Sequence, residues 1–145
     1  MPLSMIGSSA FEKCENLHSV IFPENAVELK DFAFKNCSIA SLIVTLKQSD
    51  SCSEVFANCT QLKNAVIRGF LGIKMFSSCT ALTNISVEGN IIRIPMQCFA
   101  SCSSLKSIDI YSINSILYID DGAFSGCASL ENFALENTNA TLLGA

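Results

Sequence analysis

The stretch Ile6-Gly7-Ser8-Ser9-Ala10-Phe11-Glu12-Lys13-Cys14-Glu15-Asn16-Leu17 contains a phrase that returns through the whole chain. Phe-x-x-Cys occurs six times at intervals of 20 to 25 residues, always with an apolar residue directly before the Phe. The copies are Phe11–Cys14, Phe34–Cys37, Phe56–Cys59, Phe76–Cys79, Phe99–Cys102 and Phe124–Cys127. A repeat of this length is one coil of a solenoid, because so short a unit buries its apolar face only by stacking on its neighbours. The sequence therefore predicts one repeat domain over residues 1–145.

A strand pattern follows each cysteine. An apolar residue stands three positions after the cysteine, or two in the shorter second copy, and then two apolar residues separated by one: Val20 and Phe22, Leu42 and Val44, Ala65 and Ile67, Ile85 and Val87, Ile108 and Ile110, Phe133 and Leu135. This alternation predicts strands with one buried face, arranged in one parallel sheet. The three-residue spacing of Ala-Phe-x-x-Cys suits a short helical turn on the opposite side. We therefore predict an α/β repeat with the sheet on the concave face and helical turns on the convex face.

Two copies depart from the pattern. The segment that leads to Phe56, residues 45–52, is polar and has Ser51 where the other copies have Ile or Leu. We therefore expect this connecting segment, called here the crossing, to be the most weakly packed part of the solenoid. The fifth copy is the longest, and its extra residues predict a bulged loop over residues 111–116.

The repeated phrase resembles the BspA-type class of leucine-rich repeats, whose consensus reads roughly Ile-Gly-x-x-Ala-Phe-x-x-Cys-x-x-Leu-x-x-Ile-x-Ile-Pro. Residues 6–17 carry this consensus almost complete, and Val20, Ile21, Phe22 and Pro23 finish it. Only the first copy keeps the proline; Thr45, Arg68, Glu88, Tyr111 and Glu136 replace it in the others. The resemblance implies a leucine-rich-repeat solenoid of about six coils. It also implies a surface protein of the kind found in anaerobic bacteria and parasitic protists, associated with adhesion to host cells and matrix proteins.

The ends of the chain leave its location open. Residues 1–6 lack the basic start and long apolar stretch of a signal peptide, and no apolar run approaches the length of a membrane span. Neither terminus supplies the polar cap that a solenoid needs, so we expect the chain to be part of a longer array, with room for an export signal elsewhere. The resemblance favours a cell-surface or secreted location, and a cytoplasmic one is the alternative.

The eight cysteines invite a chemical interpretation. Six occupy one repeat position, where a buried thiol behaves as a small apolar side chain, although the spacing does not exclude disulfides between neighbouring coils. Cys98 replaces the alanine before Phe99 and is expected in the core. Cys52 lies outside the repeat position and is our candidate for an exposed, reactive thiol.

Catalysis and cofactors find little support in the residues. The single histidine, His18, has no paired cysteine at zinc-site spacing and no carboxylate placed for a Ser-His-Asp arrangement. We predict no catalytic, metal or cofactor site and therefore no enzyme. The net charge is −4, and the nine Lys and Arg residues are scattered, which argues against a nucleic-acid partner.

The outward positions of the strands form the candidate protein-binding face. Between the buried apolar positions stand Ile21, Ile43, Val66, Ser86, Asp109 and Ala134, and the first three predict an exposed apolar stripe. A polar strip of Ser19, Ser41, Asn64, Asn84, Ser107 and Asn132 runs beside it, next to His18, Ala40, Lys63, Thr83, Lys106 and Glu131. We expect binding through Ile21, Ile43, Val66, His18, Lys63, Asn64 and Asn84. Ordinary β-propensity at half-buried positions is the alternative explanation of the stripe.

The preferred function is a non-catalytic protein-binding module that contacts host or extracellular-matrix proteins through this face. The alternative is an intracellular leucine-rich-repeat scaffold or receptor that uses the same face, which many unpaired thiols would suit. The ligand and the oligomeric state are not indicated by the sequence.

Overall fold

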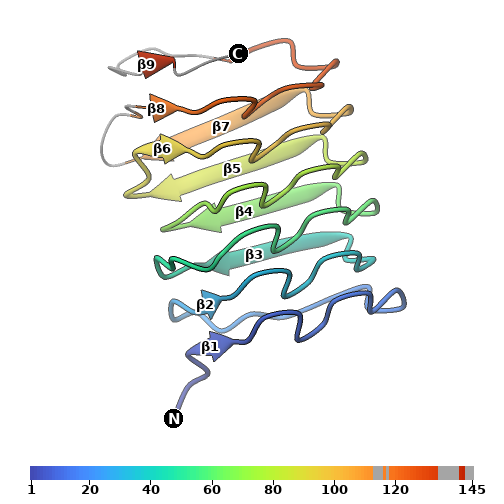
Figure 1. The fold of residues 1–145 in the computed structure, drawn as a ribbon, viewed down its shortest axis with the longest axis vertical. Helices are drawn as coiled ribbons and strands as arrows, with labels where there is room; N and C mark the ends of the chain where they lie inside the picture. Colours follow the sequence, from blue (N-terminus) through green and yellow to red (C-terminus); the bar gives the residue numbers. More distant parts are fainter. Residues whose placement is uncertain (113–115, 117, 134–140, 143–145) are drawn as a thin grey trace.

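The computed structural model describes residues 1–112, 116, 118–133 and 141–142, which form a stack of coils along one axis (Figure 1). Every strand pair is parallel. The strands in chain order are β1 (Met5–Ile6), β2 (Glu28–Leu29), β3 (Ser41–Thr45), β4 (Asn64–Arg68), β5 (Asn84–Gly89), β6 (Arg93–Ile94), β7 (Ser107–Ser112), β8 (Tyr118–Ile119) and β9 (Thr141–Leu142).

The main sheet has the order β3-β4-β5-β7, and two smaller sheets, β1-β2 and β6-β8-β9, lie on the opposite side of the stack (Figure 1). In the main sheet the buried residues of each strand pair with those of the next, so that Leu42, Ala65, Ile85 and Ile108 form one row. The core lies between these rows and the smaller sheets. The predicted parallel-sheet solenoid is confirmed for these four strands.

The predicted helical turns are wrong, because no helix occurs among the described residues. Each Ala-Phe-x-x-Cys segment is instead a run of tight turns, as where the Cys79 N–H donates to the Phe76 carbonyl over 3.1 Å. Each of these turn segments has two residues with positive φ, one two positions before the Phe and one two positions after it; in the fourth copy these are Lys74 (φ 53°) and Ser78 (φ 61°).

A left-handed residue at every fourth position interrupts helical hydrogen bonding and turns alternate N–H groups along the stack. These N–H groups find their partners in the next coil. The Phe76 N–H donates to the Cys98 carbonyl and the Ser78 N–H to the Ala100 carbonyl, both over 2.8 Å. The next coil therefore supplies the hydrogen-bond acceptors that a helix would provide within its own backbone.

Two side-chain ladders run through these turns. Phe34, Phe56, Phe76 and Phe99 are buried, with ring centroids 5.5–5.6 Å apart and planes within 12° of parallel. Beside them each thiol donates to the phenylalanine carbonyl of the preceding coil over 3.0–3.3 Å, in Cys37, Cys59, Cys79, Cys102 and Cys127. All eight cysteines are free. Of the six at the repeat position, four are buried as predicted (Cys37, Cys59, Cys79 and Cys102), whereas Cys127 is partly exposed and Cys14 is exposed.

The third copy interrupts the smaller sheet. Between β2 and β6 no short strand forms, at the crossing where the sequence departs from the repeat. Ser51 is exposed, and Cys52 turns inward, only 5% exposed, so the prediction of an exposed thiol is wrong. Burial raises the pKa of the Cys52 thiol to about 12, which keeps it protonated and unreactive at neutral pH.

The crossing at Cys52 is also closely packed. A Cβ added at Gly72 would lie 1.8 Å from the Cys52 carbonyl oxygen, so only glycine fits there. The predicted looseness of residues 45–52 stays a prediction. Of the predicted bulged loop, Tyr111 and Ser112 continue β7, and residues 113–115 lie outside the described residues.

Candidate protein-binding surface

The outward side chains of β3, β4, β5 and β7, called here the strand face, form straight rows because the pairing runs without a shift. The middle row is Ile43, Val66, Ser86 and Asp109. Ile43 is 59% exposed and Val66 is partly exposed. The structure thus brings these two apolar residues together at one end of the row, with polar residues at the other. Ala134, expected to continue the row, lies outside the described residues.

The predicted polar strip lies beside the middle row. Asn84 donates from Nδ2 to the Asn64 Oδ1, and Ser107 donates from Oγ to the Asn84 Oδ1, both over 3.4 Å. Asn132 pairs with Ser107 through an isolated bridge. The side chains of this strip are therefore partly ordered by contacts across the strands and present amide and hydroxyl groups to solvent.

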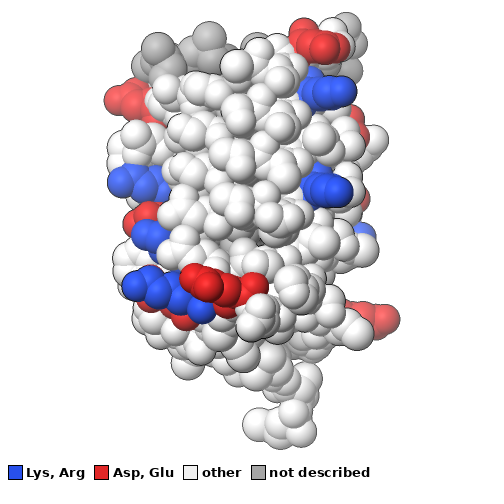
Figure 2. Space-filling model, turned by 90° about the vertical axis from the view of Figure 1, so that its right-hand side faces the viewer, with Lys and Arg blue, Asp and Glu red and all other residues white. Residues whose placement is uncertain are grey.

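His18 and Lys63 stand in the next row, where the strands begin. Backbone hydrogen bonds join it from coil to coil: the Ala40 N–H donates to the His18 carbonyl over 3.2 Å, and the Lys63 N–H to the Ala40 carbonyl over 2.9 Å. Both His18 and Lys63 are exposed. Figure 2 views the side of the solenoid on which the strands begin. Lys and Arg stand mainly at its margins, and the central column is uncharged above a group of acidic and basic side chains near its lower end.

The first copy departs from the predicted strand. No strand forms at Val20–Phe22. Among the described residues, the backbone of residues 18–27 is hydrogen-bonded to the next coil only near its two ends, where the His18 carbonyl accepts from the Ala40 N–H and the Val27 N–H donates to the Thr45 carbonyl over 3.0 Å. From His18 to Val27 the chain takes nine residue steps, whereas Ala40 to Leu46, which pair with these residues, takes six. The longer segment must arch away from the sheet.

Ile21 therefore does not join the apolar row as predicted. It is 97% exposed but lies on the arch, separated from β3. Phe22 reaches inward from the same segment, edge-on to Phe34 (centroids 5.6 Å, planes at 76°) and to Phe56 (6.4 Å, 85°). At the equivalent position the other strands carry smaller residues, such as Val44, so the phenylalanine ring helps to hold this segment off the sheet.

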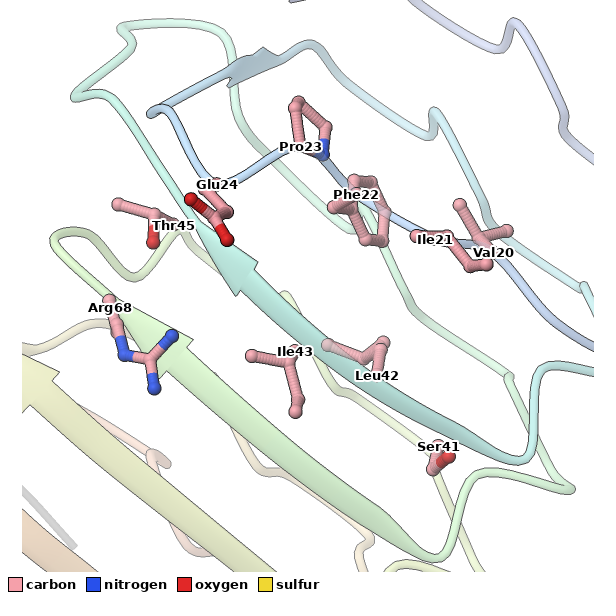
Figure 3. A pocket seen from close by; sticks show the side chains of 10 residues that line it. All are labelled: Val20, Ile21, Phe22, Pro23, Glu24, Ser41, Leu42, Ile43, Thr45 and Arg68. Atoms are coloured by element: carbon pink, nitrogen blue, oxygen red, sulfur yellow. The ribbon is translucent and has the colours of Figure 1, made fainter.

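The arch leaves a hollow of about 620 Å³, called here the edge groove. Figure 3 shows Val20 to Glu24 on the arch, which runs beside β3, with Arg68 contributed by β4. This volume is within the range of ligand-binding pockets. Its lining is Val20, Ile21, Phe22, Pro23, Glu24, Ser41, Leu42, Ile43, Thr45 and Arg68.

The prediction missed a further row of the strand face: Thr45, Arg68, Glu88 and Tyr111 stand in register at the consensus proline position. The Arg68 Nε lies 2.6 Å from the Glu88 Oε2, and Tyr111 is 64% exposed. The two-residue period that places Ile43 outward also places this row outward, so the signal was present in the sequence. The edge groove had no such signal, because it depends on the unequal lengths of two paired segments.

Reactive thiols and metal ligands add no further functional group to this surface among the described residues. Burial raises the pKa of Cys59 and Cys102 to about 12, so both stay protonated. In the part of the chain that the structure describes, no group of three or more His, Cys, Asp or Glu side chains could hold a metal ion. The described residues also contain no helix long and apolar enough to cross a membrane.

A parallel-sheet solenoid built from one repeated turn is the architecture of a repeat protein, and a leucine-rich repeat is one of its classes. The BspA type leucine rich repeat region matches residues 1–71 and 69–144 in six copies, and the chain belongs to this family.

The fold is similar to that of a leucine-rich repeat protein from Bacteroides ovatus, with a TM-score of 0.73 and 23% identity, covering 99% of this chain and 43% of that chain. A leucine rich cell surface protein from Faecalibacterium prausnitzii matches with a TM-score of 0.39 and 17% identity, covering 98% of this chain and 57% of that chain. The chain thus spans less than two thirds of the length of either. A comparison with curated proteins found no match.

Proposed function

We propose that this chain is a non-catalytic protein-binding module of a cell-surface or secreted protein, which contacts host or extracellular-matrix proteins through its strand face. The observation that carries the proposal is the unbroken register of β3, β4, β5 and β7, which lines up exposed side chains in straight rows. Exposed Ile43 beside Val66 supplies apolar contact, and the rows with Asn64, Asn84 and Lys63 supply polar contacts around it. Membership of the family supports the class of function.

The test is binding of the purified chain to immobilised collagen, laminin, fibronectin and vitronectin, compared with Val66→Glu. A carboxylate in the apolar centre of an interface stays desolvated and unpaired, so we expect binding to fall by tenfold or more, at roughly 1.4 kcal/mol for each factor of ten. Gln61→Glu is the matched control, because this substitution adds the same charge as Val66→Glu at an exposed position on a turn outside the strand face. Circular dichroism should be the same for all three proteins.

Binding that neither variant changes would show that the partner uses another surface. Absence of binding to the whole panel would favour the second candidate, an intracellular scaffold that uses the same face. The thiol ladder motivates that candidate, because its hydrogen bonds require reduced cysteines and disulfides are rare in reducing compartments. Titration of free thiols in protein isolated from its native source, under denaturing conditions, separates the two locations.

A further inference from the structure

We propose that the edge groove binds an extended polypeptide segment of a partner, which adds to β3 as a strand. The inference rests on the proposed function, since it names one mode by which a protein-binding module would hold its partner. It goes further by identifying the recognised group as peptide backbone. The argument depends on the hydrogen-bonding groups at the outer edge of β3.

Residues of a central parallel strand bond alternately to one neighbour and then to the other. In β3 the alternation is visible at its end, where the Leu46 N–H donates to the Arg68 carbonyl over 2.7 Å and the Thr45 carbonyl accepts from Val27 on the opposite side. Leu42 and Val44 belong to the set that bonds to β4. The N–H and C=O of Ile43 therefore point away from β4, into the edge groove.

Nothing in the arch satisfies these two groups. Among the described residues, no backbone hydrogen bond joins residues 19–26 to residues 41–44. Ile43 also lines the edge groove and is 59% exposed as a residue, so solvent reaches this part of the sheet edge. An unpaired donor and acceptor spaced along a strand edge are a template for another strand.

The arch is poorly suited to fill the position itself. It has three more residues than the segment of β3 that it spans, Phe22 is held by Phe34 and Phe56, and Pro23 has no N–H to donate. Closure would have to pull the Phe22 ring from these contacts and accommodate the surplus residues. The edge is therefore kept open by the same residues that create the groove.

The lining indicates which segment fits. Ile21 and Ile43 offer apolar contacts on either side, which suits alternating β-branched side chains. Glu24 is exposed and has no ion pair in the described part of the chain, whereas Arg68 is paired with Glu88. An extended segment with alternating Val and Thr and a basic residue at its end matches the groove in backbone, shape and charge.

The probe is the peptide Thr-Val-Thr-Lys with blocked ends, which is short enough to lie between the two points where the arch pairs with the next coil. Its control is the same peptide N-methylated at every residue amide. N-methylation keeps the side chains and removes the backbone donors. We expect the unmodified peptide to bind the whole chain, and the methylated peptide not to bind, by isothermal titration calorimetry. Equal binding of both peptides, or no binding of the unmodified peptide up to about 1 mM, overturns the proposal.

Ile43→Pro tests the site on the protein. Proline removes the Ile43 N–H, which β4 does not use, and proline is tolerated where a strand N–H faces outward. We expect peptide affinity to fall about tenfold, as for loss of a hydrogen bond together with steric blocking of the edge, while the control Ile43→Val binds as wild type. Unchanged affinity of a folded Ile43→Pro contradicts the proposal.

Two measurements keep the proposal testable if that variant fails to fold. Deletion of residues 24–26 makes the arch as long as its β3 partner, so the edge should close and peptide binding should disappear. In the unmodified protein the Ile43 amide should exchange rapidly with solvent and become protected when the peptide is added; protection without the peptide would refute an open edge. Val66 does not line the groove, so Val66→Glu should spare peptide binding and separates failure of this inference from failure of the proposed strand-face function.

Discussion

The phenylalanine ladder predicts that the same substitution has different costs in the middle and at the end of the stack. Phe76 is fully buried and stacks on both sides, on Phe56 at 5.5 Å and on Phe99 at 5.6 Å. Phe11 is 41% exposed and, among the described residues, stacks on the single ring of Phe34 at 5.1 Å. Phe76→Ala and Phe11→Ala therefore remove the same atoms from different surroundings.

A buried Phe→Ala change costs about 3–5 kcal/mol, and each aromatic pair adds about 0.5–1.5 kcal/mol beyond its buried area. Phe76→Ala should fall in the upper part of that range, about 4–5 kcal/mol. Phe11→Ala loses one pair and only part of its buried area, so about 1–2 kcal/mol is expected. In a solenoid, Phe76→Ala also weakens the interfaces with both neighbouring coils, whereas Phe11→Ala weakens one.

The assay is urea denaturation at 25 °C, followed by circular dichroism and extrapolated linearly to water. Natural domains have about 5–15 kcal/mol of stability, so Phe76→Leu, expected to lose less, serves if the alanine variant is unfolded. The three proteins must have equal m-values for their free energies to be compared, because a variant in which the two halves of the solenoid unfold separately does not unfold in one step. Equal losses for Phe76 and Phe11 would refute the idea that stacking on two sides stabilises the middle of the ladder.

Three further predictions concern the thiols and the glycines. Burial raises the pKa of Cys59 from 9.0 to about 12, so the contribution of the protonated thiol to the free energy of unfolding is complete below pH 9 and is lost as the pH rises towards 12, by about 1.4 kcal/mol per pH unit. Cys59→Ala should therefore show a shallower fall of the unfolding free energy across this pH range, and an unchanged slope would contradict the assignment. Gly72→Ala should lose about 3 kcal/mol or more in urea denaturation, because its Cβ would overlap the Cys52 carbonyl, while Gly7→Ala, with open space around it, should lose little; similar losses would disprove the close crossing. A thiol reagent should label Cys14, which is exposed, much faster than Cys52 in the native chain, and rapid labelling of Cys52 would contradict its burial.

Much of the strand face could be predicted from the sequence because each of the two periods in the sequence has a direct structural meaning. The 20–25-residue repeat sets which residues lie in the same row from coil to coil, and the two-residue period sets which side chains point outward. The outward positions of Ile43, Val66, Asn64 and Asn84 follow from these periods, and their role in binding stays a prediction. The burial of the repeat cysteines holds in the middle of the stack but not for Cys14, which is exposed in the first coil. The unrecognised row with Tyr111 followed the same rule.

The errors arose where local spacing has more than one structural solution. A three-residue spacing is compatible with a helical turn and with tight turns that contain left-handed residues, and the hydrogen bonds to the next coil favour the second. At the third copy, Cys52 rather than Ser51 enters the core, because a shift of one residue brings an apolar side chain to the buried side. Neither choice can be made from one coil considered alone.

The sequence by itself determined the resemblance to the family, the parallel stacking of the coils and the rows of the strand face, because these follow from a period that every copy shares. Only the tertiary structure decided where the edge of β3 is left open. The arch from His18 to Val27 has ordinary strand alternation, and its surplus of three residues exists only relative to the segment of the next coil with which its ends pair. Pairing across coils, not the pattern within one coil, determines which backbone groups remain free.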